Sequence, residues 1–469
     1  MEVSTVIPCG GISGSALETD ARFEKICHRA AMLALDESYG LHREHMTLRL
    51  TSTAGEARVI MEPSLADVGQ LFTELPHQVV NLAAFGPPAF TARMREVGAT
   101  LREILLPFSG SELAVIRRLN PSLREAARRA HRPPDSALII IREHALLEKL
   151  NMIQSLIDGG LRADQIIFVP KPDATRYRER VIAHLRSIDC TVIDSDWTRS
   201  LTDELASRPT PDLDIVLVDD GGRLIQLVMR AQGIHARSVV AIETNSSGMK
   251  RLTEAGLTDE VVNLSDSPAK ERANAWIAVS GVHGFKSYLA HRRQAGQYCH
   301  LIGYGKIGSF AAESLRASGF RVTVSEVSAD RRALAERHGF AVYESAQKAL
   351  RSEQHRYVFG CSGMPALTLS DLGLLAPDAV LASLSSNDFA AVIAAAAEDS
   401  GWRSWSDPSG THLEREGARV LLLADGHAIN LHGAEGVPEP DFDEFVATVI
   451  GAIDDELARI ASQPKRLVC

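Results

Sequence analysis

Several features that would place this chain in a common class are missing from its sequence. No run of Lys and Arg stands out against a net charge of −10, so nucleic-acid binding has little electrostatic support. The six cysteines form no C-x-x-C pair and no Cys/His cluster of zinc spacing, which predicts no metal site and fits a reduced cytoplasm. No run of about 18 apolar residues is available to span a membrane, and residues 1–21 lack the basic start and apolar centre of a signal peptide. We therefore expect a cytoplasmic protein with no nucleic-acid or membrane partner.

Length and composition indicate a folded chain of more than one domain. At 469 residues the chain exceeds one compact core, and roughly two to four domains are expected. A hydrophobic content of 45% and a charged content of 23% are ordinary for globular proteins. Residues 1–120 combine a helical segment at 21–35 with an alternating apolar and polar segment at 46–60. We predict an α+β extension here, and its sequence assigns it no chemistry.

From Ser136 onward, short apolar runs typical of buried strands alternate with segments of helical periodicity. The first set of strand-like runs lies at 136–141, 165–170, 190–194, 213–220 and 238–244. After a long helical segment at about 271–291, the alternation restarts at Gln297, with runs at 299–302, 321–326, 357–360 and 379–385. This rhythm predicts an α/β fold with two doubly wound, Rossmann-like parallel sheets and a ligand-binding cleft between them. The predicted domains are 1–120, 121–280 (completed by 432–469) and 281–431.

A glycine-rich turn follows the strand at 299–302. Gly303, Gly305 and Gly308 form a G-x-G-x-x-G pattern that also contains Lys306 and Ile307, and a helical segment runs from it to Gly319. Such a turn lets the backbone approach a pyrophosphate at the start of a helix. Glu326 ends the next strand, 23 residues after Gly303 (326 − 303), where a carboxylate binds the ribose hydroxyls of NAD and repels the extra phosphate of NADP. NAD is the predicted cofactor, although Arg331 and Arg332 leave weak use of NADP open.

Three polar stretches precede this turn. Residues 219–222, 243–248 and 263–267 each follow a strand-like run, and the last leads into a helix that carries Lys270 and Asn274 one turn apart. Open α/β sheets bind ligands at the carboxyl ends of their strands. The alternative is that these residues are ordinary turns and helix caps, since Asp, Asn, Ser and Gly favour such positions.

The ordered motifs are HALLEKLNMIQSL, VDDGG, ETNSSGMKRL, NLSDSPAK, GYGKIG followed by Glu326, FGCSGM and GHAINL. In order and spacing they resemble those of the S-adenosylhomocysteine hydrolase (adenosylhomocysteinase) family, whose enzymes act in one-carbon metabolism. The similarity spans about 144–430 and omits the first 120 residues. It implies a divergent member of that superfamily with an extra N-terminal region, bound NAD, a nucleoside-like small-molecule substrate and assembly as a homo-oligomer.

The resemblance also implies a chemistry. In that family the 3′-hydroxyl of a nucleoside is oxidised by bound NAD, a base removes the acidified C4′ proton, a 5′ group leaves or adds, and the ketone is reduced again. Lys270 is then expected to deprotonate the ribose hydroxyl, Glu243 to bind the 2′-hydroxyl, and His144 and Asp220 to handle protons near C4′ and C5′. The residues expected to line the nicotinamide-ribose side are Thr244, Asn245, Ser246, Ser362, Gly363 and Asn430.

The chain departs from the family at several functional positions. Asn274 and Ala275 stand where the family has Asp-Asn, and Ser386 replaces its second histidine. An amide at 274 still forms hydrogen bonds but is no base. Taken alone, His144 is equally explained as a helix-start residue, Asp220 and Glu243 as caps, and Lys270 as a solvated surface residue.

Three functions follow from this pattern. The first is an adenosylhomocysteinase-like hydrolase or lyase acting on a nucleoside or its thioether. The second is an NAD-dependent nucleoside or sugar oxidoreductase or epimerase. The third is a catalytically inactive NAD-binding regulator, since a fold does not fix a function.

Overall fold

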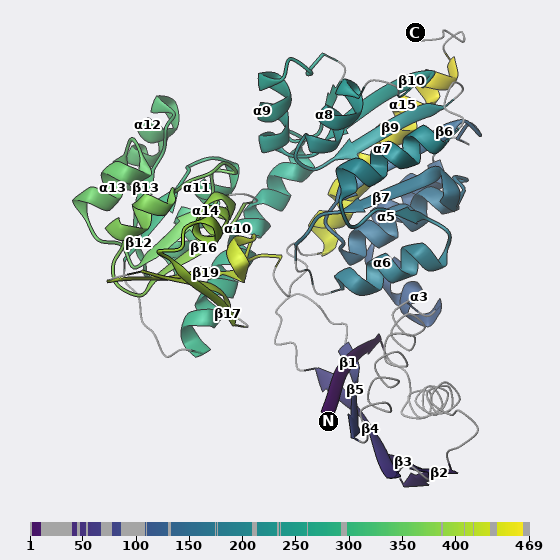
Figure 1. Ribbon diagram of the computed structural model, residues 1–469. Coiled ribbons are helices and arrows are strands. Elements are labelled where there is room, and N and C mark those ends of the chain that lie inside the picture. Colours follow the sequence, from purple (N-terminus) through teal and green to yellow (C-terminus); the bar gives the residue numbers. More distant parts are fainter. Residues whose placement is uncertain are drawn as a thin grey trace. The chain divides into compact units, whose positions relative to one another are not determined.

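The computed structural model describes the backbone at 2–10, 40–44, 47–52, 55–66 and 77–85, residue 108, and residues 110–462 apart from short gaps. The gaps are 130–132, 174, 176, 209–212, 232–233, 235, 260, 292–297, 386–387, 408, 416 and 432–438. The predicted helix at 21–35 and Ser386 therefore lie outside the described residues. Two units are distinguished: Met1–Pro121 with Tyr177–Val192, and Ser122–Arg176 with Ile193–Cys469. Figure 1 labels the helices and strands and colours them along the chain.

The N-terminal region contains an antiparallel sheet of five strands in the order β1-β5-β4-β3-β2. The alternating segment predicted at 46–60 becomes two of these strands, β3 and β4, which pair from Thr47↔Ile60 to Ser52↔Gly55. The predicted mixture of helix and strand is therefore present in this part of the chain. The strands are β1 (Glu2–Gly10), β2 (Gly40–Glu44), β3 (Thr47–Ser52), β4 (Gly55–Ala66) and β5 (His77–Phe85), and the helices that follow are α3 (Gly110–Leu119) and α4 (Pro121–Arg129).

The second sheet has the order β11-β10-β9-β6-β7-β8. Its central strands pair in parallel. The strands ALIIIRE (137–143) and DIVLVD (214–219) are fully buried and lie in the middle of the sheet, as expected for strands covered on both faces. Its strands are β6 (Ala137–Glu143), β7 (Ile166–Pro170), β8 (Thr191–Val192), β9 (Asp214–Asp219), β10 (Ser238–Glu243) and β11 (Val261–Asn263). Its helices are α5 (Leu147–Asp158), η1 (Ala163–Gln165), α6 (Arg178–Ser187), α7 (Trp197–Ser207), α8 (Arg223–Arg230) and α9 (Ser246–Glu254).

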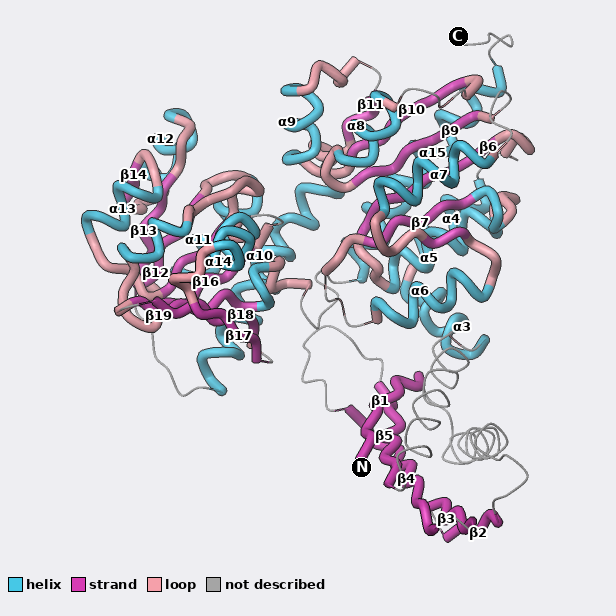
Figure 2. The backbone as a smooth tube through the Cα atoms, in the orientation of Figure 1, coloured by secondary structure: helices cyan, strands magenta, loops and turns pink. Residues whose placement is uncertain are grey.

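The third sheet has the order β14-β13-β12-β15-β16-β19-β18-β17 (Figure 2). Its first six strands are parallel and, counted along the chain, run 3-2-1-4-5-6, the order of a Rossmann fold. The strands are β12 (Tyr298–Ile302), β13 (Arg321–Ser325), β14 (Ala341–Tyr343), β15 (Tyr357–Gly360), β16 (Ala379–Ser383), β17 (Arg403–Asp407), β18 (Gly410–Arg415) and β19 (Ala418–Leu423). The helices are α11 (Lys306–Ala317), α12 (Ala329–Arg337), α13 (Ala346–Ser352), η3 (Leu369–Leu374), α14 (Ala390–Glu398) and η4 (Ala424–Gly426).

The sequence predicted two parallel sheets, and the third sheet adds an antiparallel edge to that fold. β17 and β18 pair antiparallel with each other, and β18 pairs antiparallel with β19. Their short connections, at 408–409 and 416–417, suit hairpins, whereas a parallel connection needs a dozen or more residues. Two α/β sheets of Rossmann type are therefore present, as predicted, and the second one is mixed.

Two long helices complete the chain. α10 (Pro268–His291) contacts α11, and α15 (Glu439–Ser462) contacts α5, α10, β9 and β10. The Asp443 carboxylate of α15 accepts the backbone N–H groups of Ser122 (2.7 Å) and Leu123 (2.9 Å), so it caps the start of α4. Among the described residues, no helix combines the length and apolarity needed to cross a bilayer.

Candidate active site

The glycine turn after β12 has the conformation that its sequence predicts. Gly303 has φ +97°, and a Cβ there would lie 3.0 Å from the backbone carbonyl of Cys361. At Gly308 a Cβ would come within 2.0 Å of the Gly303 carbonyl oxygen. Gly305 is the N-cap residue of α11. The backbone of the turn, which has no side chain here, therefore adjoins the first N–H groups of that helix, which lack partners within the helix. This cradle suits a pyrophosphate.

Replacing Gly308 by alanine is expected to separate α11 from the turn, because the new methyl group and the Gly303 oxygen cannot occupy the same space. We expect a loss of about 1–3 kcal/mol in the free energy of unfolding, typical of overpacking, together with weaker NAD binding. Urea unfolding and calorimetric titration with NAD measure the two effects.

Gly451→Ala is the matched control for this prediction. Gly451 lies inside α15, and a Cβ there meets no atom within 4 Å. The free energy of unfolding of this variant should rise by about 0.5–1 kcal/mol, since glycine weakens a helix interior relative to alanine. The variant should bind NAD normally. Unchanged NAD affinity in Gly308→Ala would contradict the close packing assigned to the turn.

Glu326 follows β13 and turns its carboxylate back toward the glycine turn. The carboxylate accepts the backbone N–H groups of Tyr304 (2.7 Å) and Ser328 (2.9 Å). A carboxylate has about four acceptor positions, so lone pairs remain for the hydroxyls of a ribose. Arg332 donates to the carbonyls of Glu326 and Val327, whereas a guanidinium nitrogen of Arg331 lies 3.3 Å from where a Cβ of Gly305 would stand.

One cavity of about 670 Å³ joins the glycine turn to the polar stretches of the second sheet. Its volume is within the range of small-molecule sites. The cavity is lined by residues of the glycine turn and by residues of α9 and α10. The side chains suited to a dinucleotide and those suited to a second small molecule therefore face the same space. The sequence-predicted residues that line it are His144, Asp220, Asn245, Ser246, Lys270, Asn274, Gly303, Gly305, Lys306, Ile307, Glu326, Ser362, Gly363 and Asn430.

Asn430, Ser362 and Gly363, which also line this cavity, offer polar groups for a nicotinamide. Asn430 is buried, and its Oδ1 atom has no hydrogen-bond partner among the described residues, as expected where a ligand N–H completes the site. The Ser362–Gly363 segment is held by Asp388, whose carboxylate accepts from Ser362 Oγ (2.7 Å) and from the backbone N–H groups of Ser362 (2.9 Å) and Gly363 (3.1 Å). Together with the glycine cradle, these residues fit NAD.

Lys270 is half-buried and supplies an ammonium group to the same cavity. Its Nζ atom lies 4.6 Å from the centre of the Phe445 ring. Burial lowers the pKa of Lys270, Asp220 and Glu143 oppose that change, and Lys149 and Lys171 add to it. A lysine of this kind gives up its proton more readily than a solvated one. Asn274, one turn further along α10, also lines the cavity.

His144 and Asp220 lie at the carboxyl ends of β6 and β9. His144 Nδ1 is 2.6 Å from Asp173 Oδ2, and its Nε2 is 3.1 Å from Lys171 Nζ. Lys171 Nζ also lies 2.8 Å from Asp220 Oδ1. The N-cap residue of α5 is Leu146, so the capping role considered for His144 is not present. At the other strand the capping group is Asp219, whose Oδ2 accepts from Leu224 and Ile225, which leaves Asp220 to face the cavity.

Glu243 and Thr244 are not among the residues that line the cavity. Glu243 is fully buried, and its Oε1 accepts the N–H groups of Gly221 (3.0 Å) and Asn245 (2.8 Å), which gives it a turn-stabilising role. Burial, Asp219 and Asp220 raise its pKa well above the usual range. Its Oε2 has no partner among the described residues. Thr244 donates to the Asp219 carbonyl (3.1 Å), and Asn245 donates to Asp220 and caps α9.

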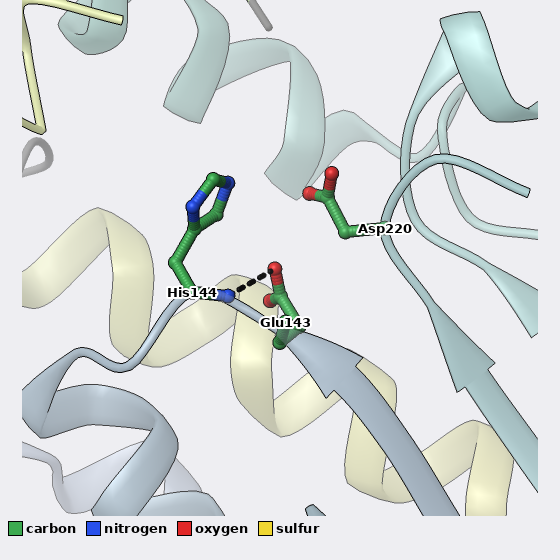
Figure 3. A group of neighbouring side chains, drawn as sticks. All are labelled: Glu143, His144 and Asp220. Carbon is green, nitrogen blue, oxygen red and sulfur yellow. Dashed lines mark hydrogen bonds between the residues drawn. The ribbon is translucent and has the colours of Figure 1, made fainter. Parts of the chain in front are cut away.

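Glu143, His144 and Asp220 also bring ligand atoms of metal-binding type within 4.8 Å of one another (Figure 3). Figure 3 shows these side chains converging from the end of β6 and from the turn after β9. Ammonium groups already pair with the acids, however: Lys149 with Glu143, and Lys171 with Asp220. Two buried cations at these carboxylates disfavour a divalent ion by direct repulsion. The cluster is therefore better described as a set of ion-paired and hydrogen-bonded side chains than as a metal site.

Sequence reasoning missed Lys171 and Asp173, which complete this cluster. Lys171 directly follows β7, the same position relative to a strand that singled out Asp220 and Glu243. The rule that ligands bind at the carboxyl ends of parallel strands therefore applied to Lys171 as well. The segment at 170–174, PKPDA, instead looks like an ordinary proline-containing turn. Lys149 was missed because it lies within a helix whose apolar periodicity accounts for most of its residues.

The fold and the site define an α/β protein with a Rossmann-type dinucleotide-binding domain. Residues 290–436 match the model of the S-adenosyl-L-homocysteine hydrolase NAD-binding domain. The match contains the glycine turn, Glu326, Ser362, Gly363 and Asn430, so NAD is the cofactor of this domain. His144, Asp220, Glu243, Lys270 and Asn274 lie outside the matched residues.

Solved structures are also similar to this chain, at low sequence identity. One dipicolinate synthase chain, from Bacillus halodurans, is 12% identical, with a TM-score of 0.34, 71% of this chain covered and 100% of that chain. A dipicolinate synthase chain from Bacillus subtilis is 13% identical, with a TM-score of 0.35, and the match covers 70% of this chain and 100% of that chain. A 2-hydroxyacid dehydrogenase from Ketogulonicigenium vulgare Y25 is 14% identical, with a TM-score of 0.35, and the match covers 71% of this chain and 98% of that chain.

Proposed function

We propose that this protein is an NAD-dependent, adenosylhomocysteinase-like enzyme that acts on a nucleoside or nucleoside thioether through transient oxidation of its 3′-hydroxyl. The observation that carries the proposal is the shared cavity, in which Lys270 and Asp220 stand together with the glycine turn and Asn430. NAD, when bound, supplies the oxidising and reducing half of such a reaction. The remaining steps need a base for the hydroxyl and a base for a carbon acid.

Lys270 is the proposed base for the ribose hydroxyl. It must be neutral when it accepts the proton, and burial favours that form. Asn274 can donate or accept a hydrogen bond at the same hydroxyl. His144 is the proposed base for the C4′ proton, and Asp220 holds the polar groups around it. Glu243 acts on the turn that carries Asn245, and direct contact of Glu243 with a 2′-hydroxyl stays a prediction.

A second function is favoured by one observation, the amide at position 274. Asn274 lines the cavity but cannot take a proton. An enzyme that stops after oxidation, or that returns hydrogen to the opposite face as an epimerase does, needs fewer acids and bases than a hydrolase. An inactive regulator would instead conserve NAD binding alone. Assembly as a homo-oligomer is part of the proposal for all three.

Adding adenosine to the NAD-loaded protein is expected to convert bound NAD to NADH, followed by near-ultraviolet absorbance and fluorescence. Chromatography of the products then separates the two reactions: release of a thiol from a nucleoside thioether supports the hydrolase, and a keto or epimeric nucleoside supports the second function. If neither adenosine nor any thioether analogue changes the spectrum, the hydrolase proposal is wrong and the inactive regulator is favoured.

A further inference from the structure

Lys171 is a buried cation beside the site, and the steps proposed above give it no role. Its side chain is 7% exposed and does not line the cavity, whereas both of its partners do. The ammonium nitrogen lies 3.1 Å from His144 Nε2 and 2.8 Å from Asp220 Oδ1. Lys171 therefore acts on the cavity through His144 and Asp220.

The groups on either side of His144 define where its ring hydrogen is. Asp173 Oδ2 is 2.6 Å from Nδ1, and a carboxylate can only accept, so Nδ1 carries the hydrogen. Lys171 as an ammonium can only donate, so Nε2 must accept. Burial opposes both charges, but the hydrogen bond from His144 and the charge of Lys171 lower the pKa of Asp173 below its usual range, and Asp220 and Asp173 raise the pKa of Lys171. Both partners are charged at neutral pH.

The positive charge of Lys171 also opposes a second positive charge on the neighbouring ring. Without it, His144 would stand between the carboxylates of Asp173 and Asp220, and two nearby anions favour an imidazolium. An imidazolium has no lone pair to accept a proton. Other charged groups face the cluster as well. His427 Nδ1 is 3.8 Å from Asp173 Oδ1, Glu143 accepts from the His144 backbone N–H, and Arg142 and Lys270 act electrostatically on Lys171 and Asp220.

We propose that Lys171 is a positioning residue that holds His144 neutral, in the Nδ1–H tautomer, so that Nε2 carries no hydrogen and can act as the base of the reaction once Lys171 releases it. The base role of His144 rests on the proposed function; the tautomer does not. In the step itself, Nε2 takes the C4′ proton while the electron pair of the C–H bond stays with the carbon beside the ketone. Lys171 releases Nε2 and keeps its bond to Asp220, and the imidazolium is balanced by Asp173. The proton returns from Nε2 in the reverse step.

Nitrogen NMR of the full-length, NAD-loaded protein labelled with [15N]histidine tests the tautomer directly. The chain contains 16 histidines, so the spectrum of His144→Gln identifies the His144 signals. We expect Nδ1 of the wild-type protein to be pyrrole-like and Nε2 to be pyridine-like near neutral pH. Lys171→Met should convert both to imidazolium-like signals, and Lys348→Met, which removes an exposed lysine on α13, should change neither. A wild-type protein with hydrogen on Nε2, or an unchanged pattern in Lys171→Met, overturns the proposal.

Kinetics give the second measurement. In Lys171→Met the adenosine-dependent exchange of the C4′ hydrogen with solvent should fall about 10²–10⁴-fold, the contribution of a positioned base, and the loss should be smallest at high pH, where the imidazolium loses its proton. Lys171→Arg keeps a donor cation and should restore part of the rate. A loss in Lys171→Met that is equal at every pH, with no rescue by arginine, would show a purely structural role. If adenosine produces no NADH in the wild-type protein, the proposed function fails, and the NMR result still decides the role of Lys171.

Discussion

Replacement of Lys270 is expected to stop the reduction of bound NAD by a nucleoside. Lys270 is half-buried and lines the cavity shared with the glycine turn, and Asn274, its neighbour on α10, is no base. Removing a positioned base costs about 10²–10⁴-fold in rate. We therefore expect Lys270→Ala and the bulkier Lys270→Met to lose NADH formation by that factor while NAD stays bound, since the turn, Glu326 and Asn430 are untouched.

The measurement combines stopped-flow absorbance on adding adenosine with calorimetric titration of NAD. Lys270→Met keeps apolar contact with Phe445, so a defect shared by both variants arises from the lost amine. Lys348→Met is the control, because that lysine is exposed and pairs only with Glu344 among the described contacts. Normal NADH formation in Lys270→Met would show that another group takes the hydroxyl proton.

The same assignment predicts a pH dependence. If neutral Lys270 is the base, NADH formation must rise with pH and level off once the amine is deprotonated. Because burial lowers its pKa, the midpoint should lie below the ordinary lysine value of 10.5. Lys270→Met should lose this rise. A rate that falls with increasing pH over this range would contradict the role of Lys270 as a base.

The glycine turn could be predicted from sequence because its determinants are local. A buried strand, three glycines at fixed spacing and a helix follow one another within about 20 residues, and the turn geometry forces the glycines at 303 and 308. Glu326 could be placed because the second strand of a Rossmann unit ends at a fixed distance from the first. The parallel strand orders follow from alternation of strands and helices for the same reason.

The charged cluster could be predicted only in part, because its members are brought together by the sheet and not by spacing. His144, Lys171 and Asp220 come from three different strands, and only the order β9-β6-β7 makes them neighbours. Sequence could also not tell which of two adjacent aspartates caps α8 and which faces the cavity. The side-chain directions decide that, with Asp219 bound to the backbone and Asp220 bound to Lys171.

Glu326→Ala is expected to weaken NAD binding far more than NADP binding. A hydrogen bond to a charged group contributes about 1.5–3 kcal/mol, so loss of the ribose contact should reduce NAD affinity roughly 10- to 150-fold. NADP gains from removal of a negative charge that repels its 2′-phosphate, and the Arg331 guanidinium beside Gly305 offers a partner for a phosphate. Calorimetric titration with each cofactor measures the ratio of affinities.

A second variant separates charge from geometry. In the wild-type protein Glu326 also accepts the N–H groups of Tyr304 and Ser328, so alanine removes a support of the turn as well as a ribose ligand. Glu326→Gln keeps one acceptor oxygen and loses the charge, and it should raise the NADP-to-NAD affinity ratio with a smaller loss of overall binding. Adding Arg331→Ala to that variant should return the ratio toward NAD, because the guanidinium beside Gly305 is then absent. If Glu326→Gln weakens both cofactors equally, the carboxylate acts only on the turn and cofactor choice lies elsewhere.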